Sequence, residues 1–173
     1  MVPDETLVQK VLDGDSKALD ELLERYYPKI LKYCLWHLSS KEEAEDATQE
    51  VMIKVVRHIR RSTRSFHFKS YIYQIAKNTC IDICRKKHID TVPLDTLTHE
   101  AVLTETAYGF KDEELISLIS ALPDDLREVI LLRYGQQMSL QEISEATGVP
   151  LRTAQSRLHR AVSRIRKEYR NDA

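Results

Sequence analysis

Residues 138–167 read MSLQEISEATGVPLRTAQSRLHRAVSRIRK, which is the pattern of two helices joined by a tight turn. Ser139 is placed to cap the first helix, and Glu142 three residues later completes a capping box. Gly148 can adopt the positive φ that a tight turn requires, and Pro150 suits the start of the following helix. The stretch therefore predicts a helix–turn–helix.

The second helix of this motif is polar and basic on the face that does not pack inward. Ala154 and Leu158 are expected in the core. Arg152 and Gln155 are the predicted base readers, because Arg favours guanine and Gln favours adenine in the major groove. The other predicted DNA contacts are Thr153, Ser156 and His159, with Arg157, Arg160 and Arg164 holding phosphates. The alternative is a helical hairpin with a basic outer face that binds no DNA.

Charge alternates along the chain, although the net charge of the whole is only −1. Counted in four blocks, residues 1–56 carry −5, residues 57–90 carry +7, residues 91–130 carry −7 and residues 131–173 carry +4. Local fields, rather than the total, decide where a polyanion binds. The two basic blocks therefore predict two contacts with one long nucleic acid, the alternative being solvated helix faces.

Composition favours a cytoplasmic, mostly helical protein. Only 4 of the 173 residues are Gly and 5 are Pro, which leaves few tight turns. No apolar stretch approaches the ~20 residues of a membrane span, and the N-terminus lacks a signal peptide's apolar core, so no membrane insertion is expected. Three cysteines form no disulfide framework and are interpreted as reduced thiols.

Apolar periodicity places the helices upstream of the motif. One long amphipathic helix runs through residues 19–34, capped by Asp15 or Ser16, with a kink or short break expected at Pro28. A second helix follows Ser39-Ser40, and a third runs from about residue 69 to 87. Periodicity is lost over residues 88–108 and resumes at 115. The sequence predicts an all-α fold of two small helical domains, 1–88 and 111–173, joined by a flexible linker over 89–110.

The stretch SFHFKSYIYQIAKNTCIDICRKK, residues 65–87, joins four aromatic residues to a basic end. Aromatic rings beside positive charge can be core followed by a solvated helix end, or a surface that stacks on unpaired bases and holds phosphates. Helical spacing places Ile72, Ile75 and Ala76 in the core, where one of Tyr71 and Tyr73 can join them.

Three segments in series, EAEDATQEVMIKV (43–55), SYIYQIAKNTCIDICRKK (70–87) and LPDDLREVILLRY (122–134), resemble the extracytoplasmic-function group of bacterial sigma factors. The resemblance implies that the acidic helix docks on core RNA polymerase. The positions matching that family motif are Asp46, Gln49, Glu50, Val51 and Lys54.

The same resemblance implies that the aromatic–basic helix recognises and melts the −10 promoter element, and that the C-terminal helix–turn–helix recognises the −35 element. The residues suited to that −10 contact are Phe66, Phe68, Tyr71, Tyr73 and Asn78, with Arg85 and Lys86 on the backbone. Tyr71 stands where the family commonly has Trp, which should keep an aromatic plug but alter its reach. Arg152 replaces a frequent Gly and Gln155 a frequent Lys, so an altered −35 preference is expected. The family also implies an anti-sigma partner.

Neither catalysis nor a bound cofactor is expected. No nucleophile–base arrangement, P-loop or dinucleotide glycine motif is present. Cys80, Cys84 and His88 follow one another at single helical turns, but no C-x-x-C pair occurs, and free cysteines are usually buried. Two alternatives stay open: a helix–turn–helix regulator that acts without docking on polymerase, and a redox or metal sensor that uses the three cysteines.

Overall fold

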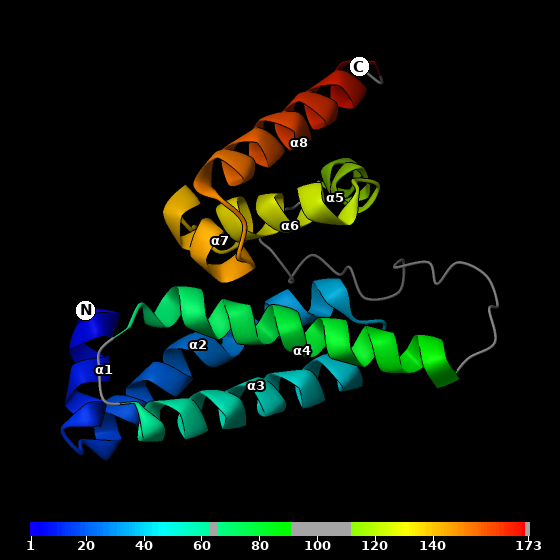
Figure 1. Cartoon of the computed structure of the whole chain (residues 1–173). Coiled ribbons are helices and arrows are strands. Elements are labelled where there is room, and N and C mark those ends of the chain that lie inside the picture. The colour runs from blue at the N-terminus through cyan, green and yellow to red at the C-terminus, as the bar shows by residue number, and fades with distance from the viewer. Residues whose placement is uncertain (63–65, 91–111, 172–173) are drawn as a thin grey trace. The chain divides into compact units, whose positions relative to one another are not determined.

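The computed structural model describes residues 1–62, 66–90 and 112–171, and within these ranges every regular element is a helix (Figure 1). The chain divides into two compact units, Met1–Thr98 and His99–Ala173. The all-helical, two-domain fold predicted from the sequence is confirmed. The expected linker over 89–110 lies, from residue 91 onward, outside the described residues. No helix in the described part of the chain is long and apolar enough to cross a membrane.

The first unit is a bundle of helices α1 (Asp4–Leu12), α2 (Ser16–His37), α3 (Lys41–Arg61) and α4 (Phe68–Asp90). Helices α2, α3 and α4 contact one another pairwise and lie side by side, and α1 packs on all three (Figure 1). The core is built where their apolar stripes meet, with Tyr26, Tyr33, Phe68 and Tyr73 as the largest of its fully buried side chains. This packing leaves one face of α3 and parts of α4 open to solvent.

Helix α2 begins at the cap predicted from the sequence, because the Asp15 carboxylate accepts hydrogen bonds from the amides of Lys17 and Ala18. The helix then runs through Pro28 without the expected break. Pro28 and Glu24, whose carbonyl loses its helical partner there, are both exposed. Water can therefore satisfy the freed carbonyl.

Helix α1, which the sequence did not reveal, is tied to α2 by a half-buried polar cluster. Asp4 accepts from the Arg25 guanidinium at 2.5 Å and from the hydroxyl of Tyr26. Arg25 also donates to the carbonyl of Val2 at 2.9 Å. These contacts close the bundle at its N-terminal end and fix the orientation of Tyr26, against whose ring Phe68 of α4 packs.

The second unit contains α5 (Glu113–Ser120), α6 (Asp124–Ile130), a π-helical turn over Leu131–Gly135, α7 (Leu140–Thr147) and α8 (Leu151–Asn171). Helix α8 packs on α5, α6 and α7. It buries Ala154 and Ala161, whereas Leu158, expected in the core, is only half-buried. The small buried alanines let the helix lie close to its neighbours while its broad polar face stays outside.

The helix–turn–helix is present with the local geometry that the sequence predicts. The Ser139 hydroxyl accepts from the amide of Glu142 at 3.2 Å, and the Glu142 carboxylate accepts from the amide of Ser139 at 2.7 Å. Gly148 ends α7 with φ +73°, a left-handed conformation that disfavours any residue with a Cβ. The Ser144 hydroxyl donates to the carbonyl of Val149 at 2.6 Å and fixes the turn.

Candidate functional site

The solvent-facing side of α3 carries most of the residues matched to polymerase docking. Asp46, Gln49 and Glu50 are exposed on one face of the helix. Val51, predicted as a contact residue, is not on that face: it is fully buried in the α3 stripe that meets α2 and α4. A valine between two helical neighbours cannot reach a partner without unfolding the bundle.

Lys54 is half-buried and directed back into its own unit. Its ammonium lies 2.7 Å from the Glu50 carboxylate and donates to the Thr79 hydroxyl of α4 at 3.0 Å. Lys54 therefore joins α3 to α4 and steers Glu50, one turn earlier on the helix. Its role in the structure is to position the acidic face rather than to extend it.

Ile53 is the residue on this face that the sequence reasoning missed. Its side chain is 52% exposed and lies at helical spacing from Asp46, Gln49 and Glu50. We call the surface formed by Asp46, Gln49, Glu50 and Ile53 the docking face. An apolar side chain inside a polar rim is the composition of a protein–protein contact. The available signal was an isoleucine out of phase with the buried stripe of 44, 47, 48, 51 and 55.

The four aromatic residues around the start of α4 divide into two pairs. Phe68 and Tyr73 are buried, Phe68 edge-on to Tyr26 at 5.1 Å between ring centroids and Tyr73 edge-on to Tyr33 at 5.6 Å. Both were predicted as DNA contacts, and in this structure neither ring offers a face to a base. Phe66 and Tyr71 are only half-buried.

Phe66 and Tyr71 share a cluster with His58 from the last turn of α3. His58 stacks on Tyr71 at 4.1 Å between centroids, and Phe66 lies edge-on to both rings at 5.0 and 5.1 Å. Burial lowers the pKa of His58 and raises the pKa of Tyr71, so both rings are uncharged at neutral pH. We call these three residues the aromatic cluster. His58 was not foreseen, because its partners Phe66 and Tyr71 follow 8 and 13 residues later in the chain, beyond the reach of helical spacing.

The C-terminal part of α4 presents the predicted polar and basic residues to solvent. Asn78, Arg85 and Lys86 are exposed. Lys87, in contrast, forms an ion pair with Glu43 in the first turn of α3. Arg85 and Lys86 are therefore accessible to a ligand, whereas Lys87 links α4 to α3.

Helix α8 places its predicted DNA-binding residues on one outer surface. Arg157 lies 3.4 Å and Arg160 3.9 Å from the same carboxylate oxygen of Asp125 on α6. Asp125 therefore holds these two arginines near the protein surface before any phosphate arrives. The exposed members are Arg152, Gln155, Ser156, His159, Arg160 and Arg164, and the half-buried members are Thr153 and Arg157.

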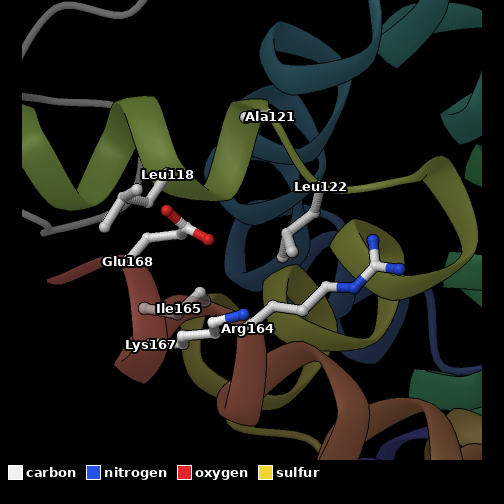
Figure 2. Close-up of a pocket in the computed structure, with 7 residues that line it drawn as sticks. All are labelled: Leu118, Ala121, Leu122, Arg164, Ile165, Lys167 and Glu168. Carbon is white, nitrogen blue, oxygen red and sulfur yellow. The ribbon is translucent and has the colours of Figure 1, made fainter. Parts of the chain in front are cut away.

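A groove of about 480 Å³ lies between α5 and α8. Figure 2 shows Leu118 and Ala121 on one side of it and Ile165 and Glu168 of α8 on the other. Arg164, expected to hold a phosphate, lines this groove together with Leu122 and Lys167. The groove thus combines an apolar floor with a charged rim.

Elsewhere, Cys34 and Cys80 are buried and Cys84 is exposed. Within the described ranges, no three His, Cys, Asp or Glu side chains are grouped so that they could hold a metal ion.

Comparison with known proteins gives two family matches in chain order. Residues 22–88 match the model of sigma-70 region 2, and residues 112–165 match that of sigma-70 region 4. SigW, an extracytoplasmic-function RNA polymerase sigma factor of Bacillus subtilis, is 32% identical, covering 95% of this chain and 95% of its own length. The RNA polymerase sigma-H factor of Pseudomonas aeruginosa is 29% identical, covering 95% and 92%.

Two solved structures share the fold. CnrH in complex with the cytosolic domain of CnrY matches with a TM-score of 0.73 at 17% identity, covering 98% of this chain and 99% of that one. The sigma factor RpoE in complex with the anti-sigma factor NepR from Bartonella quintana matches with a TM-score of 0.70 at 19% identity, covering 91% and 99%. Because both family models match in order and a near full-length relative is 32% identical, this chain belongs to the sigma-70 family of RNA polymerase sigma factors, in its extracytoplasmic-function group.

Proposed function

We propose that the first unit of this sigma factor docks on core RNA polymerase through the docking face of α3 and captures an unpaired −10 base at the aromatic cluster. The second unit reads the −35 element with the leading end of α8. The observation that carries this assignment is Ile53, an exposed apolar side chain set among acidic and amide groups on α3. Nothing in the packing of the bundle requires an isoleucine there.

Docking through α3 fits the energetics of protein interfaces. A few central apolar or aromatic side chains usually supply most of the binding free energy, and the polar rim supplies orientation. Ile53 is the candidate centre, and Asp46, Gln49 and Glu50 are the rim. The exposed Glu50–Lys54 pair contributes little to stability, so Glu50 can exchange Lys54 for a basic partner at small cost.

Base capture at the aromatic cluster balances two free energies of similar size. Stacking a flipped base on an aromatic ring is worth about 1–3 kcal/mol, and unstacking it from the duplex costs a few kcal/mol. Phe66 and Tyr71 are half-exposed and already held by His58, so little ordering entropy is lost when a base arrives. Stacking at the cluster therefore lowers the free energy needed to open the −10 duplex, but it does not suffice to melt the duplex by itself.

The length of α4 lets one helix hold both the opened base and the adjacent backbone. From Tyr71 to Arg85 the helix rises about 21 Å at 1.5 Å per residue. At 3.4 Å per step along one strand, this corresponds to about six base steps. Asn78 lies midway, and Arg85 and Lys86 stand exposed at the far end as phosphate contacts.

Readout of the −35 element follows from the position of α8 after the turn. Arg152 and Gln155 are exposed in its first two turns, where a recognition helix reaches base edges. Arg157 and Arg160 are further along and hold phosphates, exchanging the Asp125 carboxylate for the DNA backbone. Two of the basic side chains are thus kept near their binding positions before DNA arrives.

Control by a protein inhibitor completes the proposed function. RpoE of Bartonella quintana, which shares this fold, was solved with the anti-sigma factor NepR. An anti-sigma partner of this chain would act by covering surfaces that polymerase or DNA needs. The docking face, with its exposed isoleucine, is one such surface.

The test is association with bacterial core polymerase, measured for Glu50→Lys and for a matched control. Glu24→Lys reverses another exposed acidic residue, on α2 and outside the docking face. We expect Glu50→Lys to weaken association about tenfold at low salt, with Glu24→Lys near wild type. Equal affinities of the two variants would contradict the assignment of the docking face.

A further inference from the structure

Two buried cysteines meet inside the first unit. Cys34 of α2 and Cys80 of α4 have their sulfur atoms 3.8 Å apart, and the Cys80 thiol donates to Cys34. Both side chains are at most 3% exposed. Cys84, one turn further along α4, is exposed and donates to the carbonyl of His37 at 3.6 Å.

The Cys34 sulfur sits in an environment that favours its thiolate. The hydrogen bond from Cys80 lowers the pKa of Cys34, and the neighbouring Thr48 side chain of α3 adds to this shift, while burial opposes it. The thiolate is the form that attacks peroxides and disulfides. Two thiols in contact, one donating to the other, are also the arrangement from which an internal disulfide closes with the least movement of the backbone.

We propose that Cys34 and Cys80 form a redox site that peroxides oxidise to an internal disulfide between α2 and α4. The Cys34 thiolate attacks one oxygen of hydrogen peroxide, gives a sulfenic acid and releases hydroxide, which takes a proton and leaves as water. The Cys80 sulfur then attacks the sulfenic sulfur and loses its proton, and a second water leaves. The two thiols lose two electrons in total, and the peroxide accepts them.

Closure of this disulfide draws α2 and α4 together, and both helices pack against α3, which carries the docking face. The sulfur atoms have to approach from 3.8 Å to the bond length of about 2.05 Å. Thr79, next to Cys80, accepts the hydrogen bond from Lys54, which in turn holds Glu50. Thr48, the neighbour of Gln49 on α3, interacts with Cys34. The site therefore lies beneath the docking face, and its effect on polymerase rests on the function proposed above.

The cross-link can be tested without altering the core. The full-length Cys84→Ser variant removes the exposed thiol and leaves the buried pair intact. It is treated with hydrogen peroxide, the remaining thiols are alkylated, and the protein is digested with trypsin without reduction. The substitution is needed because Cys80 and Cys84 share the tryptic peptide Asn78–Arg85, whereas Cys34 lies on Tyr33–Lys41.

The expected product is one monomer-derived peptide pair that joins Tyr33–Lys41 to Asn78–Arg85, and dithiothreitol separates it. The midpoint temperature of thermal unfolding should be several degrees higher for the oxidised protein, because the cross-link closes a long loop. Recovery of both thiols in the alkylated form, or of sulfinic and sulfonic acids without a linked pair, would overturn the proposal. A link that forms only between two chains would overturn it as well.

A second arm compares polymerase affinity of oxidised and reduced Cys84→Ser. We expect oxidation to weaken association about tenfold, and reduction to restore it. A linked pair with unchanged affinity would overturn the effect on docking and leave the redox site standing. Failure of the reduced protein to bind polymerase would instead count against the proposed function, since the mass measurement does not depend on it.

Discussion

Helices α4 and α8 are of similar length and both expose basic side chains, yet they use their residues differently. Helix α8 packs through small residues, Ala154 and Ala161, and its polar side chains remain outside. Helix α4 lies against α1, α2 and α3, and its aromatic residues are split between core and surface. In α8, the residues that pack the helix are thus of a different kind from the residues that face DNA. In α4, aromatic residues that pack and aromatic residues that face DNA lie next to one another.

Each of the two helices packs on three others, so the difference lies in the size of the side chains at the contacts. Aromatic side chains fill the space between α4 and its neighbours, whereas small alanines let α8 lie close to its own. In α4 the same residue types serve for packing and for stacking on bases. Substitutions in α4 should therefore separate into effects on stability and effects on promoter opening, whereas substitutions on the outer face of α8 should affect DNA alone.

The largest expected effect comes from Phe68. Phe68→Ala removes a fully buried ring that packs on Tyr26 and should lower the free energy of unfolding by about 3–5 kcal/mol. Phe66→Ala, two residues earlier, should cost about 1 kcal/mol or less and mainly reduce −10 opening. Denaturant unfolding and permanganate reactivity of promoter thymines measure the two effects. Equal losses of stability in Phe68→Ala and Phe66→Ala would contradict the division of these aromatic residues into a buried pair and a half-buried pair.

Docking offers the next largest effect. Ile53→Asp should weaken binding to core polymerase by about 2 kcal/mol, or roughly thirtyfold, because it places a charge at the centre of the docking face. Tyr27→Asp is the matched control, since Tyr27 is a partly exposed apolar residue of α2, 37% accessible. Fluorescence anisotropy with labelled protein would measure both affinities. Comparable losses of affinity for the two variants would show that the effect is not specific to Ile53, and would contradict the assignment of the docking face.

The −35 readout can be tested by a change on the outer face of α8. Arg152→Ala should remove about 1–3 kcal/mol of discrimination at one base pair without lowering stability. Arg166→Ala, exposed about 21 Å further along the helix, should leave the preferred sequence unchanged. A binding selection on randomised −35 sequences reads out both. A parental sequence preference for Arg152→Ala would remove it from the reading residues.

The smallest effect is a dependence of stability on pH through His58. Its folded pKa lies below the usual 6.5, so the unfolded chain binds more protons. The stability contributed by neutral His58 is therefore fully present above about pH 6.5 and declines as the pH falls below that value. His58→Gln should flatten the pH dependence of the unfolding midpoint between pH 5 and 7. An unchanged slope would place His58 outside the packed cluster.

The helix–turn–helix could be predicted almost completely because its signals are local. Ser139, Glu142, Gly148 and Pro150 each act within four residues, and each has the expected role or place. The acidic face of α3 was also predictable from spacing, apart from Ile53. The position of Ile53 outside the buried stripe could be read from spacing, but its part in a contact could not, because single apolar side chains are common on protein surfaces.

The aromatic part of α4 could not be resolved from the sequence for the opposite reason. Phe68 is buried by Tyr26, 42 residues earlier, and Tyr73 by Tyr33, 40 residues earlier. Val51 is excluded from the docking face by the same long-range packing. Helical periodicity tells which residues share a face, but it does not tell how many neighbours cover that face. The contact of Cys34 with Cys80 is likewise a product of tertiary packing.

The most direct measurement is transcription from a library of genomic fragments by bacterial core polymerase, with and without this protein. The account predicts discrete new start sites with the wild-type protein, sharing upstream −10 and −35 sequences. It also predicts none with Ile53→Asp, and a shifted −35 sequence with Arg152→Ala. New start sites that are unaffected by Ile53→Asp, or no new start sites with core enzyme from the native host, would contradict the central claim that α3 docks this chain on polymerase.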